Sequence, residues 1–271
     1  MTEELALSVS LARQAGREIM RWFGGSFAVE RKSDDSLVTP ADHAADELIR
    51  AGIAAKFPAD AILSEETADD VVRLSSERLW LVDPLDGTKH FAAGRKEFAV
   101  MIGLAFRGRP VVGVVHLPAE GVTYLGEVGW GAFRESAAEG RRPLEIRPAV
   151  PDARDIVAVV SHVGRHGRTA RAIEALGAGE VIRSGSVGRK AMMVAEGRAD
   201  AYLTASRHSR HWDSCAPEAI VRAAGGTFLE GRGRPIRYNT AETRNLYGLF
   251  ACRPGLEARL VRALLAAEEV P

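Results

Sequence analysis

One short segment, in which an apolar strand leads directly into two carboxylates, constrains the fold of this chain more than any other. Residues 79–82 are Leu-Trp-Leu-Val, which predicts a buried strand, and Pro84 ends it because its nitrogen cannot donate to a neighbouring strand. Asp83 and Asp86 then lie on either side of a tight turn, where Gly87 permits an unusual backbone angle. Oxygen ligands at this spacing suit a hard cation such as Mg²⁺, although an Asp-Gly pair alone would indicate only a surface turn.

Length and composition indicate a globular protein that does not bind a nucleic-acid polymer. The 271 residues can form one large domain or two modest ones with a sizeable core. Lys plus Arg and Asp plus Glu both number 36, and this balance lacks the basic excess that binding to phosphate backbones needs. No apolar run approaches a membrane span, and residues 1–22 predict an amphipathic helix rather than a signal peptide. The two cysteines, Cys215 and Cys252, predict no disulfide framework, and a reducing cytoplasm is the expected location.

The hydrophobic pattern predicts two halves of different architecture. In the first half, helices are expected over 3–22 and 41–57, and strands over 61–64, 98–106, 111–117 and 122–128. The last three strands should form an antiparallel meander, and the region of low hydrophobicity over 135–155 is the expected boundary. Beyond it, strands and helices should alternate over 156–161, 169–176, 181–184, 187–196, 201–204, 214–224, 245–252 and 255–267. We therefore predict an α+β metal-binding half at 1–135 and an α/β substrate-binding half at 136–271.

Three further acids lie where loops meet the predicted elements. Glu65 follows a short strand, Asp42 begins a helix, and Asp213 is the predicted N-cap of another helix, with Pro217 in its first turn. Taken singly, Asp42 and Asp213 are best explained as plain helix caps. If these acids converge with the two described above, however, they repel one another unless cations neutralise them. Two divalent ions about 3.5–4 Å apart can clamp the attacking and leaving oxygens of a phosphoryl transfer.

The order and spacing of these acids resemble those of a known family. The matching segments are Val38-Thr-Pro-Ala-Asp42, Ser64-Glu-Glu66, Asp83-Pro-Leu-Asp-Gly-Thr88 and Trp212-Asp-Ser-Cys-Ala-Pro-Glu218. With these segments the chain resembles, essentially from end to end, the inositol monophosphatase superfamily of Mg²⁺-dependent, lithium-sensitive phosphatases. The resemblance implies a layered αβαβα sandwich of the sugar-phosphatase type, with the active site at the junction of the α+β and α/β halves.

The resemblance also implies a role for each acid. The implied metal ligands are Glu65, Asp83, the Leu85 carbonyl, Asp86 and Asp213. Asp83 would be shared by two Mg²⁺ ions, and the loop at 32–36 would help to hold a third, weaker one. Thr88 would hydrogen-bond to Asp42, and this catalytic pair would orient and deprotonate the attacking water, which is consistent with the modest base that metal activation requires.

Within the superfamily, the closest resemblance is to the 3′(2′),5′-bisphosphate nucleotidases. Leu85 and Lys89 follow the nucleotidase style of that motif, whereas Leu37 and His90 depart from it. The implied substrate-binding residues are Asp86, Gly87, Thr88, Ser161, His162, Gly185, Lys190 and Asp213. The favoured substrate is adenosine 3′,5′-bisphosphate, a by-product of sulfate activation. The charged run 207–211 is expected to be a solvated loop beside the base or ribose pocket.

Two alternatives remain open at this point. The chain could instead hydrolyse inositol 1-phosphate or another small sugar phosphate, since the metal-binding segments are common to the superfamily. A protein of another class, a nucleotide-binding sensor without turnover, would keep the pocket but has no support from the sequence, because all five acids and Thr88 are present. Neither a nucleic-acid polymer nor a membrane is an expected partner, and a homodimer is compatible with the sequence.

Overall fold

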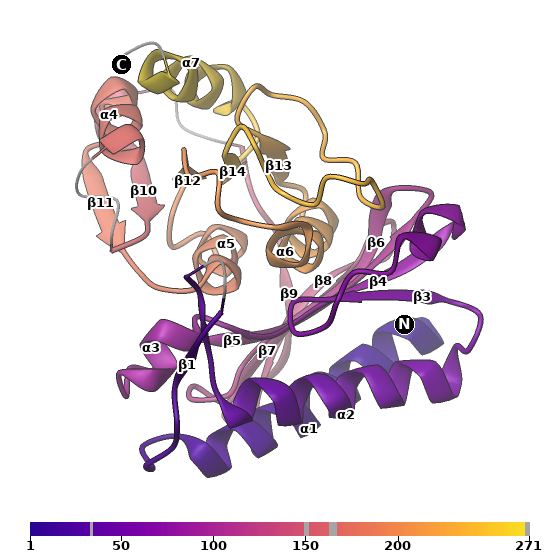
Figure 1. Ribbon diagram of the computed structural model, residues 1–271. Helices are drawn as coiled ribbons and strands as arrows, with labels where there is room; N and C mark the ends of the chain where they lie inside the picture. Colours follow the sequence, from indigo (N-terminus) through magenta and orange to yellow (C-terminus); the bar gives the residue numbers. More distant parts are fainter. Residues whose placement is uncertain (33–34, 149–151, 163–166, 269–271) are drawn as a thin grey trace.

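The protein folds into five alternating layers of helices and sheets (Figure 1). A computed structural model describes residues 1–32, 35–148, 152–162 and 167–268. Helices α1 (Glu3–Trp22) and α2 (Pro40–Lys56) cover one face of a seven-stranded sheet, and α5 (Val187–Ala195) and α6 (His211–Ala223) cover the other. A five-stranded sheet lies beyond α5 and α6, and α4 (Gly167–Leu176) and α7 (Glu257–Glu268) cover its outer face. This arrangement confirms the predicted αβαβα sandwich.

The seven-stranded sheet has the order β3-β4-β5-β6-β7-β8-β9 and is antiparallel except between β3 and β4. Its strands are β3 (Ala61–Ser64), β4 (Arg78–Asp86), β5 (Ala99–Phe106), β6 (Arg109–Leu117), β7 (Val122–Glu127), β8 (Gly131–Ser136) and β9 (Gly140–Leu144). The predicted meander is therefore present, but it continues beyond the predicted division at 135/136. Strand β9 was not predicted, because this edge strand is almost fully exposed and polar.

Strand β4 does not end at Pro84, and the predicted end of this strand is wrong. Asp83 pairs with Met101 and Asp86 with Ala99, so β4 has one residue more than β5 between these two pairs. Such a bulge leaves a residue outside the regular ladder, and a proline is tolerated there because no donor is required. The bulge brings both aspartates to the end of a buried strand.

The five-stranded sheet has the order β11-β10-β12-β14-β13, with parallel pairing around β10 and antiparallel pairing around β14. Its strands are β10 (Val157–Val160), β11 (Glu180–Arg183), β12 (Ala201–Thr204), β13 (Thr227–Glu230) and β14 (Leu249–Cys252). The sequence analysis placed the start of β14 too early and missed β13. A small hairpin of β1 (Glu30–Arg31) and β2 (Leu37–Val38), the short helix α3 (Thr88–Ala92) and two 3₁₀ turns, η1 (Val71–Ser75) and η2 (Ala153–Asp155), complete the elements.

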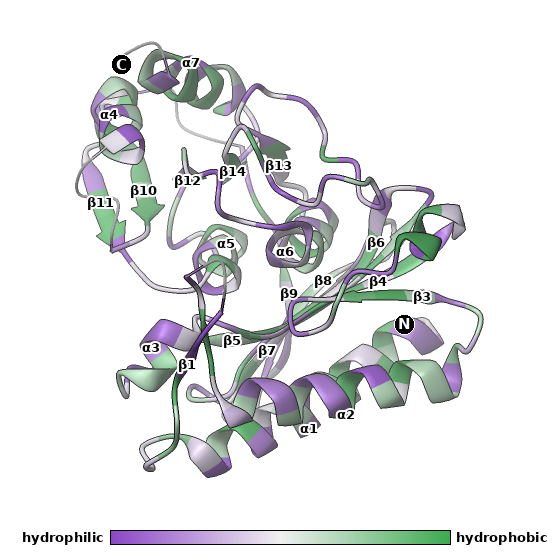
Figure 2. Ribbon diagram, in the orientation of Figure 1, coloured by the Kyte–Doolittle hydropathy of each residue, from purple (hydrophilic) through white to green (hydrophobic). Residues whose placement is uncertain are grey.

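Amphipathic packing explains the outer helix layer. Along α1 and α2, hydrophobic and hydrophilic residues alternate around the helix (Figure 2), and the buried residues of α1 recur at helical spacing from Leu5 to Ile19. These side chains pack against one face of β4, β5 and β6. No helix in the described part of the chain combines the length and apolarity needed to cross a bilayer.

A row of three glycines fixes the position of α6. Gly103, Gly113 and Gly126 are direct cross-strand partners on β5, β6 and β7. A Cβ atom added to Gly113 would lie 2.2 Å from the carbonyl oxygen of Ala216, and one added to Gly126 would lie 2.8 Å from the Cα atom of Ile220. The helix backbone therefore rests directly on the sheet, which only glycine permits.

Replacing Gly113 with alanine is expected to destabilise the protein by about 3 kcal/mol, because α6 must move away from the sheet. Denaturant unfolding measures this change. Gly94→Ala is the control, since Gly94 has no atom within 4 Å of the added Cβ and its φ of 69° leaves only backbone strain to destabilise the variant. Equal losses of stability in the two variants would contradict the steric explanation.

Candidate active site

Three carboxylates from separate elements converge at one end of the seven-stranded sheet. Glu65 follows β3, Asp83 lies in the bulge of β4, and Asp213 lies in the first turn of α6. One oxygen from each side chain lies within 4.8 Å of the other two. The residues are separated by up to about half of the chain, so the fold alone brings them together. The same cavity, of about 290 Å³, is also lined by Leu85, Asp86, Gly87 and Thr88.

Asp86 lines the same cavity, but its hydrogen bonds come from the start of helix α5. Its Oδ2 atom accepts hydrogen bonds from the hydroxyl of Ser186 and from the backbone N–H of Gly188, 2.8 Å away. Both donors belong to the first turn of α5, whose N-terminus favours a negative charge. Asp86 is thus the contact between the bulge of β4 and the second half of the chain. Ser186, which has an unusual positive φ of 60°, was not among the predicted site residues.

The electrostatics of the three converging acids fit divalent cations. Burial, followed by the charge of Glu65, raises the pKa of Asp213 to about 8, and burial with the neighbouring acids also raises the pKa of Asp83. Buried like charges so close together cannot all be ionised without a compensating cation. An oxygen-only donor set is the chemistry that Mg²⁺ prefers. The residues therefore fit the predicted metal, with Glu65, Asp83 and Asp213 as the ligands that the geometry groups.

In the structure, the ammonium group of Lys32 forms ion pairs with Glu65 and with the neighbouring Glu66. Its Nζ atom lies 3.1 Å from Oε1 of Glu65 and 2.7 Å from Oε2 of Glu66. Burial raises the pKa of Glu66 to about 7. Lys32, the first residue of the predicted loop at 32–36, thus reaches the acids that are predicted to bind metal. Residues 33–34 of this loop lie outside the described residues, so the third ion stays a prediction.

Asp42 serves both as a helix cap and as the partner of Thr88. Its Oδ2 atom accepts hydrogen bonds from the backbone N–H and the hydroxyl of Thr39, at 2.8 and 2.6 Å, and so caps the first turn of α2. Its Oδ1 atom lies 2.9 Å from the hydroxyl of Thr88, which also lies 3.1 Å from the carbonyl oxygen of Leu85. The hydrogen bond between Asp42 and Thr88 that the resemblance implied is therefore present.

Asp213 is not the N-cap of its helix, and this part of the prediction is wrong. Helix α6 begins at His211, and Oδ2 of Asp213 accepts a hydrogen bond of 2.6 Å from the backbone N–H of Arg210. Pro217 consequently lies inside the helix rather than in its first turn. Because proline has no N–H, the carbonyl oxygen of Asp213 receives no helical hydrogen bond from it.

Gly87 is required by the close approach of two chain segments. Its φ is 102°, and an added Cβ would lie 2.7 Å from the carbonyl oxygen of Glu97. Helix α3 begins at the next residue, Thr88, as expected for the predicted phosphate-binding amides. The binding of phosphate by these amides remains a prediction.

Apart from Gly87 and Thr88, which line the acid-lined cavity, the predicted substrate residues fall into two groups. Ser161 and Lys190 line a cavity of about 590 Å³ that shares Asp86 and Asp213 with the acid-lined cavity. Arg207, His208 and Ser209 of the predicted loop at 207–211 contribute to the same lining, but the prediction of a solvated loop is wrong at His211, which is buried and begins α6. Burial lowers the pKa of Lys190 to about 8, and the nearby acids oppose this shift. The structure thus places a cationic side chain beside the acids.

His162 and Gly185 form the second group, which meets at Glu97. Nε2 of His162 lies 2.9 Å from Oε1 of Glu97, and the backbone N–H of Gly185 donates to the same oxygen at 3.2 Å. Sequence analysis did not identify Glu97, because a single acid between two predicted elements carries no distinctive signal. Contact with substrate at His162 and Gly185 remains a prediction.

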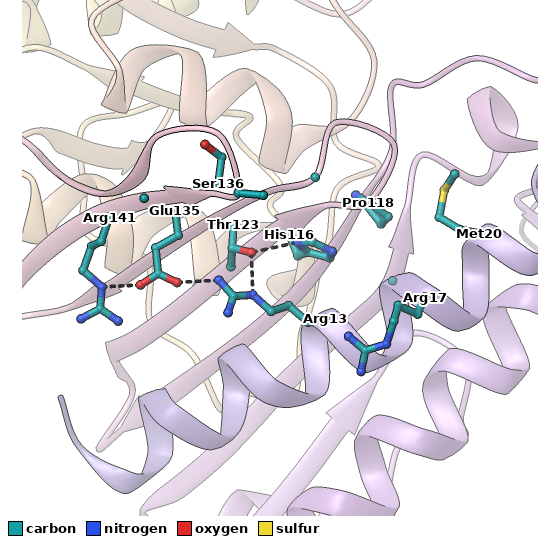
Figure 3. A pocket seen from close by; sticks show the side chains of 13 residues that line it. Arg13, Arg17, Met20, His116, Pro118, Thr123, Glu135, Ser136 and Arg141 are labelled. Carbon is teal, nitrogen blue, oxygen red and sulfur yellow. Dashed lines mark hydrogen bonds and ion pairs between the residues drawn. The ribbon is translucent and has the colours of Figure 1, made fainter.

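A larger cavity, of about 700 Å³, lies between α1 and strands β6 to β9 (Figure 3). Arg13, Glu135 and Arg141 line it, and the carboxylate of Glu135 forms ion pairs with both arginines. None of the predicted site residues lines this cavity. The predicted catalytic residue Thr88 and the three converging acids Glu65, Asp83 and Asp213 line the smaller cavity instead.

We expect His116, which also lines the larger cavity, to make the protein sensitive to acid. Its side chain is buried, with Nδ1 3.0 Å from the carbonyl oxygen of Val122, and burial lowers its pKa to about 4. The unfolded chain therefore binds a proton that the folded chain rejects between about pH 6.5 and 4. We expect the free energy of unfolding to fall by about 2–3 kcal/mol from this residue alone as the pH decreases through that interval. Denaturant unfolding at pH 7 and pH 4.5 should show a smaller decrease for His116→Gln, and equal decreases would contradict the prediction.

The fold and site together define a layered αβαβα protein with an acid-lined site between its sheets. A model of the inositol monophosphatase family matches residues 1–264. The chain therefore belongs to the inositol monophosphatase family, as the four sequence segments predicted.

Known relatives bear phosphatase names. The chain is 33% identical over 261 residues to a histidinol-phosphatase of Chlorobaculum parvum, covering 91% of this chain and 96% of the relative. It is 37% identical over 236 residues to the 3′(2′),5′-bisphosphate nucleotidase CysQ of Salmonella typhimurium, covering 86% and 93%. Among solved structures, the extragenic suppressor protein suhB of Bartonella henselae superimposes with a TM-score of 0.82 at 27% identity, covering 97% and 98%.

Proposed function

We propose that this chain is a Mg²⁺-dependent phosphomonoesterase that removes the 3′-phosphate of adenosine 3′,5′-bisphosphate in the cytoplasm. The observation that carries the proposal is the convergence of Glu65, Asp83 and Asp213 beside the hydrogen-bonded pair of Asp42 and Thr88. This combination supplies both a cation site and a proton acceptor. Hydrolysis of an adenosine bisphosphate would place the enzyme after sulfate activation, and lithium inhibition is expected from the family resemblance.

The positions of the side chains indicate which of them would bind metal and which would accept a proton. Glu65, Asp83 and Asp213, together with Asp86 and the carbonyl of Leu85, which line the same cavity, would hold the Mg²⁺ ions, which supply charge neutralisation and lower the pKa of water. Asp42 accepts the hydrogen bond of Thr88, so the Thr88 oxygen can in turn accept a proton from the attacking water. Asp42 is fixed by its hydrogen bonds to Thr39, so the pair is already oriented before substrate binds.

The second cavity favours a substrate with two phosphate groups. It adjoins the acid-lined cavity, since both are lined by Asp86 and Asp213, and it contains Lys190 together with the polar loop at 207–209. A positively charged side chain in a cavity that adjoins the acids suits a second phosphate on the same molecule. The CysQ relative, at 37% identity, bears the name of an enzyme with this specificity.

A second candidate is supported by a specific comparison. The histidinol-phosphatase relative covers more of this chain than the CysQ relative does. Histidinol phosphate has one phosphate and a cationic amine, so Lys190 would repel its amine rather than bind it. This electrostatic difference favours the nucleotide. Inositol 1-phosphate has neither a second phosphate nor an amine and remains the alternative stated from the sequence.

A substrate panel tests the proposal. We expect phosphate release in Mg²⁺ to be at least about tenfold faster, as kcat/KM, with adenosine 3′,5′-bisphosphate than with histidinol phosphate, inositol 1-phosphate or fructose 1,6-bisphosphate. The Lys190→Met variant should lose most of this preference, because its ammonium group is gone while the hydrophobic part of the side chain remains. Preference for a monophosphate would contradict the nucleotide assignment, and binding without release would identify a sensor.

A further inference from the structure

Two histidines and a glutamate meet beside the active site without any role in the metal chemistry proposed above. His90 lies in α3, Glu97 lies between α3 and β5, and His162 follows β10. One ligand atom from each lies within 4.8 Å of the other two. Nδ1 of His90 is 3.4 Å from Oε2 of Glu97, and Nε2 of His162 is 2.9 Å from Oε1. We refer to these three residues as the His-Glu-His cluster.

These distances are close to those that a single metal ion requires. Donor atoms that each lie about 2.0–2.1 Å from one tetrahedral zinc ion lie about 3.3 Å from one another. Oε2 of Glu97 lies 3.4 Å from Nδ1 of His90 and 3.1 Å from Nε2 of His162, and these two distances bracket this value. The two ring centroids are 5.5 Å apart, and one ligand atom from each of the three residues lies within 4.8 Å of the other two.

The surroundings hold two of the three side chains in place. The backbone N–H of Gly185 donates to Oε1 of Glu97 at 3.2 Å, which orients the carboxylate as an outer hydrogen bond does in metal sites. A Cβ added to Gly185 would lie 2.6 Å from Nε2 of His90, so the absence of a side chain there lets the ring approach. The cluster is partly exposed, with His90 at 17% and His162 at 35% of their side-chain surface, so an ion can enter.

We propose that the His-Glu-His cluster binds a transition-metal ion, with zinc as the best fit, at a second site separate from the carboxylates that hold Mg²⁺. Two imidazoles and one carboxylate form a ligand set that zinc uses in proteins, with a remaining position for water or substrate. Mg²⁺ prefers oxygen ligands and coordinates imidazole poorly. The two sites therefore differ in the kind of ion they select.

The charges around the cluster strengthen this selectivity. Burial lowers the pKa of His90, and Arg95 and Lys190 lower it further despite the opposing effect of Glu97, so its ring is neutral and able to bind metal at pH 7. The positive charges of Arg95 and Lys190 also weaken the binding of any cation that is held by electrostatic attraction alone. Zinc is favoured because its bonds to imidazole nitrogen outweigh this repulsion, and its binding displaces the hydrogen that His162 and Glu97 share.

Occupation of the cluster should inhibit catalysis. The ion would tie α3, which begins at the catalytic Thr88, to the end of β10, where Ser161 lines the proposed nucleotide cavity. It would also remove His162 from contact with substrate. This consequence rests on the proposed function, whereas binding of the ion does not.

Calorimetric titration with Zn²⁺, in millimolar Mg²⁺ to fill the carboxylate site, tests binding directly. We expect one saturable site in the wild-type protein and at least a tenfold weaker one in His90→Gln. His43→Gln, which removes an exposed histidine of α2 outside the cluster, should bind like the wild type. Co²⁺ provides a second readout, because nitrogen ligation in a four- or five-coordinate site gives visible absorption bands that the His90→Gln protein should lack.

Three results would overturn the proposal. The first is the absence of saturable Zn²⁺ binding in Mg²⁺, and the second is equal affinity in the wild type and His90→Gln. The third is displacement of one Mg²⁺ for each Zn²⁺ bound, which would place the ion at the carboxylates. Equal melting temperatures of the two proteins without zinc would show that His90→Gln is folded. All these measurements stand even if the substrate assignment fails, since none uses turnover.

Discussion

Replacing Asp83 with asparagine is expected to abolish phosphate release while leaving the fold intact. Asp83 belongs to the acid cluster, in which one of its oxygens lies within 4.8 Å of an oxygen of Glu65 and of Asp213. Loss of its charge removes a ligand that the two implied ions share. Metal ions contribute several kcal/mol of transition-state stabilisation, so the rate should fall by about 10³-fold or more.

The same substitution should not harm stability in the absence of metal. Asp83 is buried, at 1% exposure, and burial together with the neighbouring acids raises its pKa. A neutral side chain of the same shape removes repulsion and desolvation, so the metal-free variant should be at least as stable as the metal-free wild type. Thermal unfolding in EDTA checks this, and phosphate release in Mg²⁺ checks the loss of turnover. A rate like that of the wild type would exclude Asp83 as a shared ligand.

Replacing Thr88 with alanine is expected to slow turnover by about 10²- to 10⁴-fold, the range that a positioned proton acceptor contributes. The hydroxyl of Thr88 donates to Asp42 at 2.9 Å, and the variant leaves no group between that carboxylate and the attacking water. The concentration of Mg²⁺ that gives half-maximal rate should change little, because the three converging carboxylates remain. Steady-state rates measured over a range of Mg²⁺ concentrations separate these two effects.

Thr88→Ser is the matched control, since it keeps the hydroxyl and should recover most of the activity. An unchanged rate in Thr88→Ala would remove this residue from the mechanism. A large increase in the Mg²⁺ requirement would instead assign it a structural role, through its 3.1 Å contact with the carbonyl oxygen of Leu85. The two substitutions thus distinguish proton transfer from the positioning of a metal ligand.

Local patterns in the sequence predicted most of the fold. The helices α1 and α2 and the strands of the central meander have strong periodicity and a buried face, so their positions agree with the prediction to within a few residues. Strand β9 has no buried face and therefore no hydrophobic signal. Strand β4 continues through Pro84 because a bulge absorbs the missing donor, and this depends on the register of its neighbour β5.

The acids of the site could be predicted from the sequence, but the hydrogen bonds that orient them could not. Family resemblance supplied Glu65, Asp83 and Asp213, and the structure brings them together. The contacts that orient the site connect residues far apart in the chain, such as Ser186 with Asp86. No local sequence pattern encodes such a contact. The contact between Ser186 and Asp86 depends on how α5 and α6 pack against the seven-stranded sheet, and this packing exists only in the folded chain.

Anomalous diffraction from crystals grown with Mn²⁺ in place of Mg²⁺ tests the central claim most directly. The account predicts at least one strong peak within bonding distance of the carboxylate oxygens of Glu65, Asp83 and Asp213, and its loss in Asp83→Asn. A map without a peak among these three side chains, at Mn²⁺ concentrations that support turnover, would contradict the assignment of the catalytic metal site.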